Sequence, residues 1–183
     1  MKLTLSILVC FLFAIEKEYL LLNQSLPFFS GHTIENKAID RKYFEGKVTL
    51  INFMTIGCMP CMKEMPFLSE LQNEFPQDKF QVLCIAPHSR EHLRDFNSDA
   101  KSPYGNFRKA IKLDLVHYDL LPECEISLKD SSSTKNHLTI RPDCDSISRL
   151  FDVDGYPMTF IIDQNLIIRE IQFGYPMEVS DST

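Results

Sequence analysis

The sequence predicts an α/β domain in which a mixed central sheet is flanked by helices. Residues 47–55 ("KVTLINFMT") and 79–87 ("KFQVLCIAP") are mostly continuous runs of β-branched and aromatic residues, typical of strands buried on both faces. The segment between them has apolar residues at helical spacing, and a strand–helix–strand unit places its two strands in parallel. Near the C-terminus, "YPMTFIID" and "LIIREIQF" are separated by "QN" and predict an antiparallel hairpin at the end of the same sheet.

The elements follow one another in a simple order. "LPFFSGHTIENKAIDRKYFEGK" predicts a small N-terminal hairpin and a turn of helix before the first buried strand. Met65, Leu68, Leu71 and Phe75 mark the apolar face of the helix that follows this strand. "EHLRDFNSDA" and "YGNFRKAIKLDL" predict a second helical region, and "CDSISRLFDV" predicts a short helix before the final hairpin.

Two regions depart from this regular pattern. Residues from about Leu120 to Thr139 are polar and rich in Ser, and they predict an insertion on the surface. The chain stops soon after the last hairpin, so we expect the domain to lack a final helix and to leave one face of its sheet thinly covered.

Length and composition fit one domain with a leader and a tail. The chain has 183 residues, 44% of them hydrophobic, and its 14 Phe supply material for a real core. The net charge is -6, and Lys and Arg do not cluster, so nucleic acid is not an expected partner.

Residues 1–22 are predicted to be a signal peptide or a membrane anchor. Lys2 precedes an apolar run from Leu3 to Ile15, which has the length of the apolar part of a secretory signal and falls short of the roughly 20 residues of a spanning helix. The alternative is a buried N-terminal strand or helix. Export places residues 23–176, the domain, and 177–183, a tail, in the periplasm or on the outer side of a membrane.

Two of the six cysteines carry the candidate chemistry. Cys58 follows a strand and begins a helix, a position where free N–H groups and the helix dipole stabilise a thiolate. Such a position can lower the pKa of a thiol from about 8.5 to between about 3.5 and 7.5. Cys58 is therefore the predicted nucleophile, and Cys61, one turn later and more shielded, is the predicted resolving thiol. Pro60 fits the first helical turn, where its missing N–H costs nothing. Met59 adds no positive charge, which argues against a strongly oxidising pair.

Other interpretations of these residues stay open at this stage. A zinc site would need a second close ligand pair, which Cys124 and Cys144 do not offer. Copper is an alternative because soft methionine ligands, Met54, Met59, Met62 and Met65, surround the thiols, although methionine at helical spacing is more often part of a core. A purely structural Cys58–Cys61 disulfide is the third alternative.

The remaining cysteines and two histidines have simpler interpretations. Cys84 lies in an apolar run and is expected to be a buried, inert thiol. Cys124 and Cys144 are a possible disulfide pair in an exported chain. His88 and His92 have the spacing of a metal pair but no third ligand, and they are expected to be surface histidines.

The segment "INFMTIGCMPCMKEMPFL" resembles the active site of thioredoxin-fold proteins, and in particular of the exported TlpA/ResA-like thiol-disulfide oxidoreductases. Their pattern is Cys-x-x-Cys-x-x-Glu-x-Pro, which Cys58, Cys61, Glu64 and Pro66 fill. The resemblance runs from about Leu26 to Phe173. This chain departs from the pattern in having no Trp before the first cysteine.

The resemblance also implies how a substrate binds. "LFDVDGYPMTFIID" resembles the cis-proline loop of the family, which would place Pro157 beside the two sulfurs and let the backbone of Tyr156 pair with an extended substrate segment. Met59 and Pro60, between the cysteines, are the other candidates for substrate contact.

Glu64 is the candidate general acid/base. Thioredoxin itself has a buried Asp six residues before its first active-site cysteine, where this chain has Asn52, which cannot ionise. Glu64 lies three residues after Cys61 on the predicted helix and can move the proton of Cys61 if it is desolvated. The alternative is a solvated surface glutamate. Pro66 is expected to kink the helix.

These observations predict an exported thiol-disulfide oxidoreductase, acting as a reductase of protein disulfides and using no cofactor beyond its own cysteines. Such a protein needs an electron donor, for which the resemblance suggests a membrane thiol transporter. A thioredoxin-like binding module without turnover and a disulfide-forming oxidant are the alternatives.

Overall fold

A computed structural model describes residues 21–124 and 146–174 of the chain. Most of the predicted leader, the predicted tail and the Ser-rich part of the insertion lie outside these ranges. Within them, no helix combines the length and the apolar character needed to cross a membrane.

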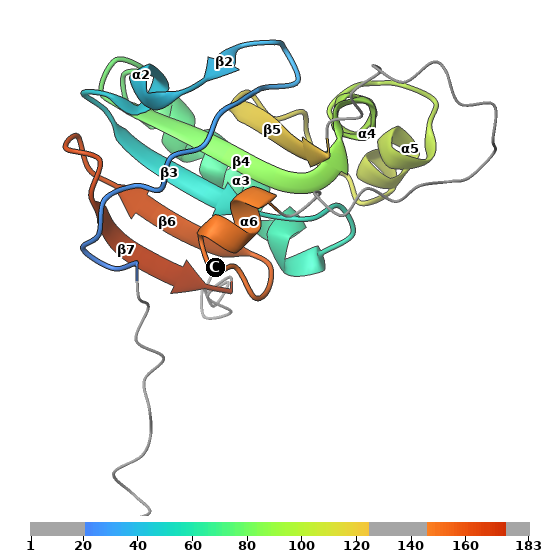
Figure 1. Cartoon of the computed structure of the whole chain (residues 1–183). Coiled ribbons are helices and arrows are strands. Elements are labelled where there is room, and N and C mark those ends of the chain that lie inside the picture. Colours follow the sequence, from blue (N-terminus) through green and yellow to red (C-terminus); the bar gives the residue numbers. More distant parts are fainter. Residues whose placement is uncertain (1–20, 125–145, 175–183) are drawn as a thin grey trace, which may run out of the picture.

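The core of the fold is a five-stranded mixed sheet in the order β5-β4-β3-β6-β7 (Figure 1). Its strands are β3 (Val48–Phe53), β4 (Phe80–Ser89), β5 (Asp119–Cys124), β6 (Met158–Ile162) and β7 (Ile168–Phe173). β3, β4 and β5 are parallel, whereas β6 is antiparallel to both β3 and β7. The predicted parallel unit and C-terminal hairpin are therefore confirmed.

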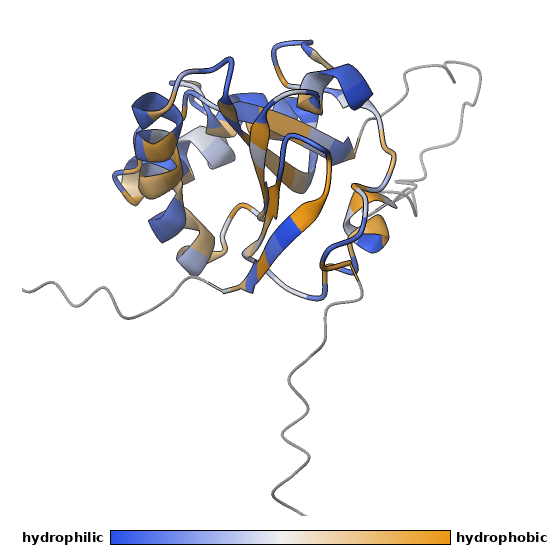
Figure 2. Cartoon of the chain, turned by 90° about the vertical axis from the view of Figure 1, so that its left-hand side faces the viewer, coloured by the Kyte–Doolittle hydropathy of each residue, from blue (hydrophilic) through white to orange (hydrophobic). Residues whose placement is uncertain are grey.

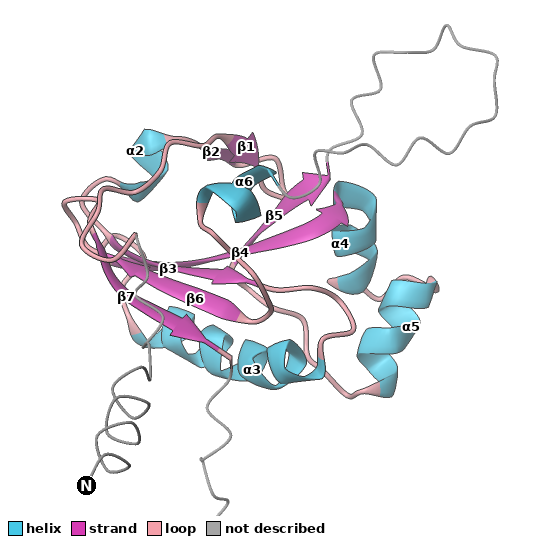
Figure 3. Cartoon of the chain, turned by 60° about the horizontal axis from the view of Figure 1, so that its bottom comes forward, coloured by secondary structure: helices cyan, strands magenta, loops and turns pink. Residues whose placement is uncertain are grey.

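The helices lie on both faces of the sheet (Figure 3). α3 (Met59–Glu74) crosses one face, and α4 (Arg90–Phe96) and α5 (Pro103–Ala110) follow β4. The hairpin of β1 (Gly31–His32) and β2 (Ala38–Ile39), α2 (Arg41–Phe44) and the short α6 (Ser146–Leu150) make up the other layer. The N-terminal hairpin, its following turn of helix and the short helix before β6 agree with the sequence-based expectation.

Alternate residues of β3 enter two separate hydrophobic clusters, which explains the unbroken apolar run of this strand. Ile51 and Phe53 pack with the N-terminal segment, α2 and α6, whereas Leu50 packs with α3 and α4. The fold therefore has a core on each face of the sheet, and Figure 2 shows hydrophobic residues in the strands and both hydrophobic and hydrophilic residues in the helices.

The expected start of the surface insertion at Leu120 is wrong, because residues 119–124 form the edge strand β5. Leu120 and Leu121 are each only 1% exposed and enter the two opposite clusters. Pro122 obscured the strand in the sequence, but an edge strand tolerates the missing N–H of proline. Glu123 is also buried: its carboxylate accepts from Ser148 N at 2.7 Å and from Ser148 Oγ at 2.6 Å, which ties β5 to α6.

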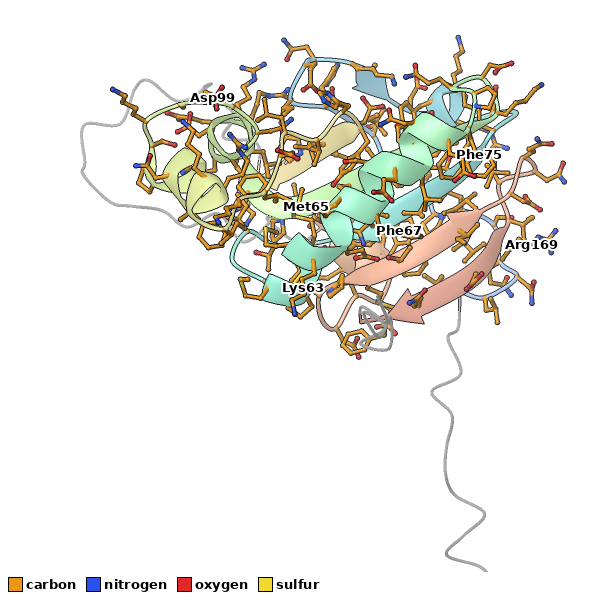
Figure 4. All side chains as sticks on the ribbon, turned by 180° about the vertical axis from the view of Figure 1, so that it is seen from behind. Lys63, Met65, Phe67, Phe75, Asp99 and Arg169 are labelled. Carbon is orange, nitrogen blue, oxygen red and sulfur yellow. A yellow bond between two sulfur atoms is a disulfide. The ribbon has the colours of Figure 1, made fainter. Side chains whose placement is uncertain are left out.

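β7 is the last element among the described residues, and no helix follows it there. α3 lies across the sheet with Lys63, Met65, Phe67 and Phe75 along its length (Figure 4). Met65 is buried against the sheet, whereas Phe67 is 51% exposed and Phe75 is 46% exposed. α3 continues through Pro66 to Glu74, and the expected kink at Pro66 stays a prediction.

Candidate redox site

The N-terminus of α3 holds Cys58 at the N-cap position. β3 ends at Phe53, and a short loop leads to Gly57, whose φ of +95° is a conformation that residues with a Cβ rarely adopt. The backbone N–H of Cys61 then donates to Cys58 Sγ at 3.2 Å, so the sulfur occupies the place of a capping oxygen. This position favours negative charge on Cys58, as the sequence predicted.

The two sulfurs form a disulfide, and they differ in their access to solvent. The Cα atoms of Cys58 and Cys61 are 5.3 Å apart. Cys61 is only 1% exposed, whereas Cys58 is partly exposed and lies beside the exposed Met59 and Pro60. Cys58 is therefore the more accessible sulfur of the pair, and Cys61 is the inner one.

Glu64 is buried beneath α3 and is not a solvated glutamate. It lies one turn after Cys61, on the same side of the helix. Asn52 Nδ2 donates to its Oε2 at 2.9 Å, and Thr159 Oγ1 donates to its Oε1 at 3.4 Å. Burial raises the pKa of Glu64, and the two hydrogen bonds oppose this shift in part.

Asn52 connects Glu64 to the two central strands. Its Nδ2 also donates to Thr159 Oγ1 at 2.9 Å, and its Oδ1 accepts from Cys84 Sγ at 3.6 Å. β3 and β4 pair Asn52 with Cys84, and β3 and β6 pair Asn52 with Thr159. Thr159 and the Cys84 contact were not predicted as parts of the site, because only the strand register brings them there. Cys84 is a free, fully buried thiol whose pKa is raised by burial, which confirms the expectation of an inert thiol.

The predicted cis-proline loop lies at the end of β6. The bond between Tyr156 and Pro157 is cis, as the resemblance implied. Met158 pairs with Phe53, the last residue of β3, so Pro157 lies beside the start of the loop that carries Cys58. Tyr156 is half-buried and packs against the cluster that contains Cys61. The structure therefore brings the Cys58–Cys61 segment and the Tyr156–Pro157 segment together.

His88 belongs to this site, and the expectation of a surface histidine is wrong for it. Its Nε2 lies 3.0 Å from both the backbone N of Ile56 and Oγ1 of Thr55, in the loop before Cys58. Burial, and secondarily the charge of His92, lowers the pKa of His88 to about 4. No sequence signal distinguishes His88 from His92, because the contact depends on β4 extending beyond the end of β3.

The alternative metal sites gain no support from the described residues. Met54, Met62 and Met65 are at most 4% exposed and belong to the core, so only Met59 remains on the surface near the sulfurs. No cluster of three His, Cys, Asp or Glu with metal-binding geometry occurs within residues 21–124 and 146–174. Cys124 is disulfide-bonded, and Cys144 lies outside the described residues, so the Cys124–Cys144 pair stays a prediction.

Comparison with known proteins identifies similar chains. The sequence pattern of the AhpC/TSA family matches residues 22–171. The chain is 28% identical to the thioredoxin-like protein YneN of Bacillus subtilis over 82% of this chain and 71% of YneN. It is 30% identical to the thiol-disulfide oxidoreductase ResA of Bacillus thuringiensis over a shorter segment, 40% of this chain and 42% of that protein.

A solved structure with the same fold is the thioredoxin domain of a thiol-disulfide oxidoreductase from Bacteroides vulgatus. It has a TM-score of 0.55 at 15% identity and covers 84% of this chain and 89% of that one. The fold is therefore thioredoxin-like. Thiol-disulfide oxidoreductases are among the similar proteins, and this is the class expected from the sequence.

Proposed function

The chain belongs to the AhpC/TSA family, and from that premise we propose that it is an exported reductase of protein disulfides. The observation that carries the proposal is the asymmetry of the two thiols. Cys58 is partly exposed at a helix N-terminus, and Cys61 is buried one turn before a buried carboxyl group. This arrangement separates the attacking thiol from the resolving thiol and gives the second one a proton acceptor.

In the first step, the Cys58 thiolate of the reduced protein attacks one sulfur of a substrate disulfide. A mixed disulfide between Cys58 and the substrate forms, and the other substrate sulfur leaves as a thiolate that takes up a proton. The helix N-terminus stabilises the attacking thiolate. The backbone of Tyr156, beside Pro157, is the proposed partner of an extended substrate segment, and the exposed Met59 and Pro60 are the proposed apolar contacts.

In the second step, Glu64 accepts the proton of Cys61. The Cys61 thiolate then attacks Cys58 Sγ, the substrate's second sulfur leaves as a thiolate that takes up a proton, and the Cys58–Cys61 disulfide forms. Two electrons and two protons have passed to the substrate. Burial raises the pKa of Glu64 toward that of a thiol. The difference in pKa between Glu64 and the Cys61 thiol is therefore smaller than it would be for an exposed carboxylate, which favours proton transfer from Cys61 to Glu64.

Two features support the reducing direction and the location. No positive charge lies between the two cysteines to make the Cys58 thiol extremely acidic, since Met59 and Pro60 are uncharged. The apolar run from Leu3 to Ile15 supports export, with or without a lasting membrane tether. The disulfide formed in each cycle must be reduced again, and a membrane thiol transporter is the proposed donor.

The reduction potential of the Cys58/Cys61 pair tests the direction. Equilibrating the chain with graded thiol buffers, and counting free thiols by alkylation and mass spectrometry, gives the potential directly. A value near that of thioredoxin, about -270 mV, supports a reductase, whereas a value near about -120 mV assigns the oxidant alternative. A pair that does not exchange at all rejects the enzymatic proposal in favour of the binding module.

A further inference from the structure

The loop between β3 and Cys58 is held from one side by an imidazole ring. β3 pairs with β4 as far as Phe53 and Ile85, and β4 then runs on to Ser89. This overhang places His88 beside the loop of residues 55–57. Within that loop Ile56 packs against the hydrophobic cluster around Cys61, whereas Gly57, the last residue, has no side chain and adopts a φ of +95°.

The hydrogen bonds define the protonation state of His88. The backbone N–H of Ile56 can only donate, so His88 Nε2 accepts this bond at 3.0 Å and carries no proton. The hydroxyl of Thr55, 3.0 Å from the same Nε2, must then be a second donor. The ring that makes both bonds is therefore the neutral form with its proton on Nδ1.

Two aromatic or titratable side chains pack near the ring. His92 of α4 and Tyr104 of α5 contact each other with ring centroids 4.5 Å apart, and Tyr104 lies edge-on to His88 at 6.2 Å. The charged Arg90 is directed elsewhere, since it donates to the backbone oxygens of His32 and Thr33 in the hairpin. No carboxylate among the described residues bonds to His88 to stabilise its protonated form, and burial together with the charge of His92 lowers the pKa of His88 to about 4.

We propose that His88 is a positioning residue of the redox site: its neutral imidazole holds the 55–57 loop, and through it the N-terminus of α3, so that Cys58 stays in its attacking position. Protonation of the ring removes the acceptor for the Ile56 N–H and releases that part of the loop, whereas Nε2–H can still donate to the Thr55 hydroxyl. The inference deepens the thiol–disulfide exchange proposed above and rests on it for its biological meaning.

Three variants of the full chain test the proposal. His88→Leu removes the acceptor for the Ile56 N–H. His88→Gln offers its Oε1 near the position of Nε2 as an acceptor, and the amide is not protonated at any pH used in the experiment. His92→Gln is the matched control, because His92 packs on the same Tyr104 ring as His88 and forms no hydrogen bond to residues 55–57. The readouts are the alkylation rate of Cys58 in the reduced protein as a function of pH, and the nuclear magnetic resonance signals of the Ile56 amide and the His88 ring.

We expect His88→Leu to lower the alkylation rate at pH 7 about tenfold, as the loss of one hydrogen bond in a positioning loop would. His88→Gln retains the rate at pH 7. When the alkylation rate is divided by the fraction of Cys58 present as thiolate, the wild-type value falls as the pH drops toward about 4, because His88 becomes protonated. The corresponding value for His88→Gln does not fall. His92→Gln keeps the rate at pH 7 and moves the inflection to higher pH. The wild-type ring signals report the tautomer with the proton on Nδ1.

Other outcomes overturn the proposal. If His88→Leu has the wild-type alkylation profile, or if the Ile56 amide does not respond to protonation of His88, the ring does not position Cys58. If His88→Leu does not fold, the alkylation rates of Cys58 in wild type and His88→Gln at low pH still test the proposal, and equal pH profiles of these two proteins would overturn it. These readouts need no protein substrate, so a failure of the proposed reductase activity would leave them interpretable.

Discussion

Replacing Glu64 by Gln separates the two steps of the proposed cycle. The amide has the shape of the carboxylic acid, and its Oε1 can still accept from Asn52 Nδ2, so the buried network keeps its acceptor. It cannot take a proton from Cys61. The attack of Cys58 on a substrate should therefore be unaffected, and the attack of Cys61 on the mixed disulfide should slow.

The size of the effect follows from burial. A thiol of ordinary pKa, about 8.5, is only about 3% thiolate at pH 7. Cys61 is 1% exposed and Glu64 is 7% exposed, so water is a poor substitute for the missing base. A positioned general base contributes about 10²- to 10⁴-fold. We expect the second step to slow by at least about 100-fold, which corresponds to about 2.7 kcal/mol in the activation barrier.

Rapid mixing with an aromatic disulfide reagent that releases a coloured thiolate measures both steps. The first release, from the attack of Cys58, depends on reagent concentration, whereas the second, from the attack of Cys61, does not. Glu70→Gln is the control, because Glu70 is an exposed glutamate on the same helix. An unchanged second phase in Glu64→Gln between pH 5 and 8, or an equal slowing in Glu70→Gln, would refute the role of Glu64.

Three further predictions concern the thiols, the buried carboxyl group and the core. Cys61→Ala should accumulate a Cys58 mixed disulfide with a disulfide-containing protein in non-reducing mass spectrometry, and Cys58→Ala should not; equal trapping by both would reverse the assignment. Because the pKa of Glu64 is higher in the folded state than its value of about 4.5 in the unfolded state, the protonated group stabilises the fold. This stabilisation is fully present below the unfolded-state pKa and is lost as the pH rises through the folded-state pKa. The free energy of unfolding of the oxidised protein, measured in urea, should therefore depend less on pH for Glu64→Gln than for wild type. Identical pH dependences of the two proteins would contradict this. Phe160→Ala removes a 0% exposed ring that contacts Phe53 and Phe151, and it should cost about 3–5 kcal/mol in the free energy of unfolding, whereas Phe28→Ala, at a 77% exposed position, should cost less than about 1.

Local sequence signals were sufficient for much of the redox segment. The strand, the glycine turn and the helix around Cys58 depend on residues within a few positions of one another, and so does the capping of α3. Glu64 could be placed one helical turn from Cys61 for the same reason. The cis bond before Pro157 came from the resemblance of a longer segment, since no local pattern identifies it.

The tertiary contacts could not be predicted in this way. β5 was mistaken for part of a surface insertion because Pro122 and Glu123 look unsuitable for a strand, and only the edge position and the bonds to Ser148 explain them. His88 was mistaken for a surface residue, because its contact with Thr55 and Ile56 joins segments far apart in sequence.

The sequence by itself therefore determined the redox pair, the helix that presents it and the alternation of strands and helices, because these depend on local spacing and capping. Only the tertiary structure decided which polar groups surround that pair. The partners of Glu64 come from β3 and β6, and the acceptor for the loop before Cys58 comes from β4. Strand register sets these contacts, and burial between the layers sets the pKa shifts of Glu64 and His88. Strand register and burial are properties of the folded sheet, so they could not be predicted from the local sequence.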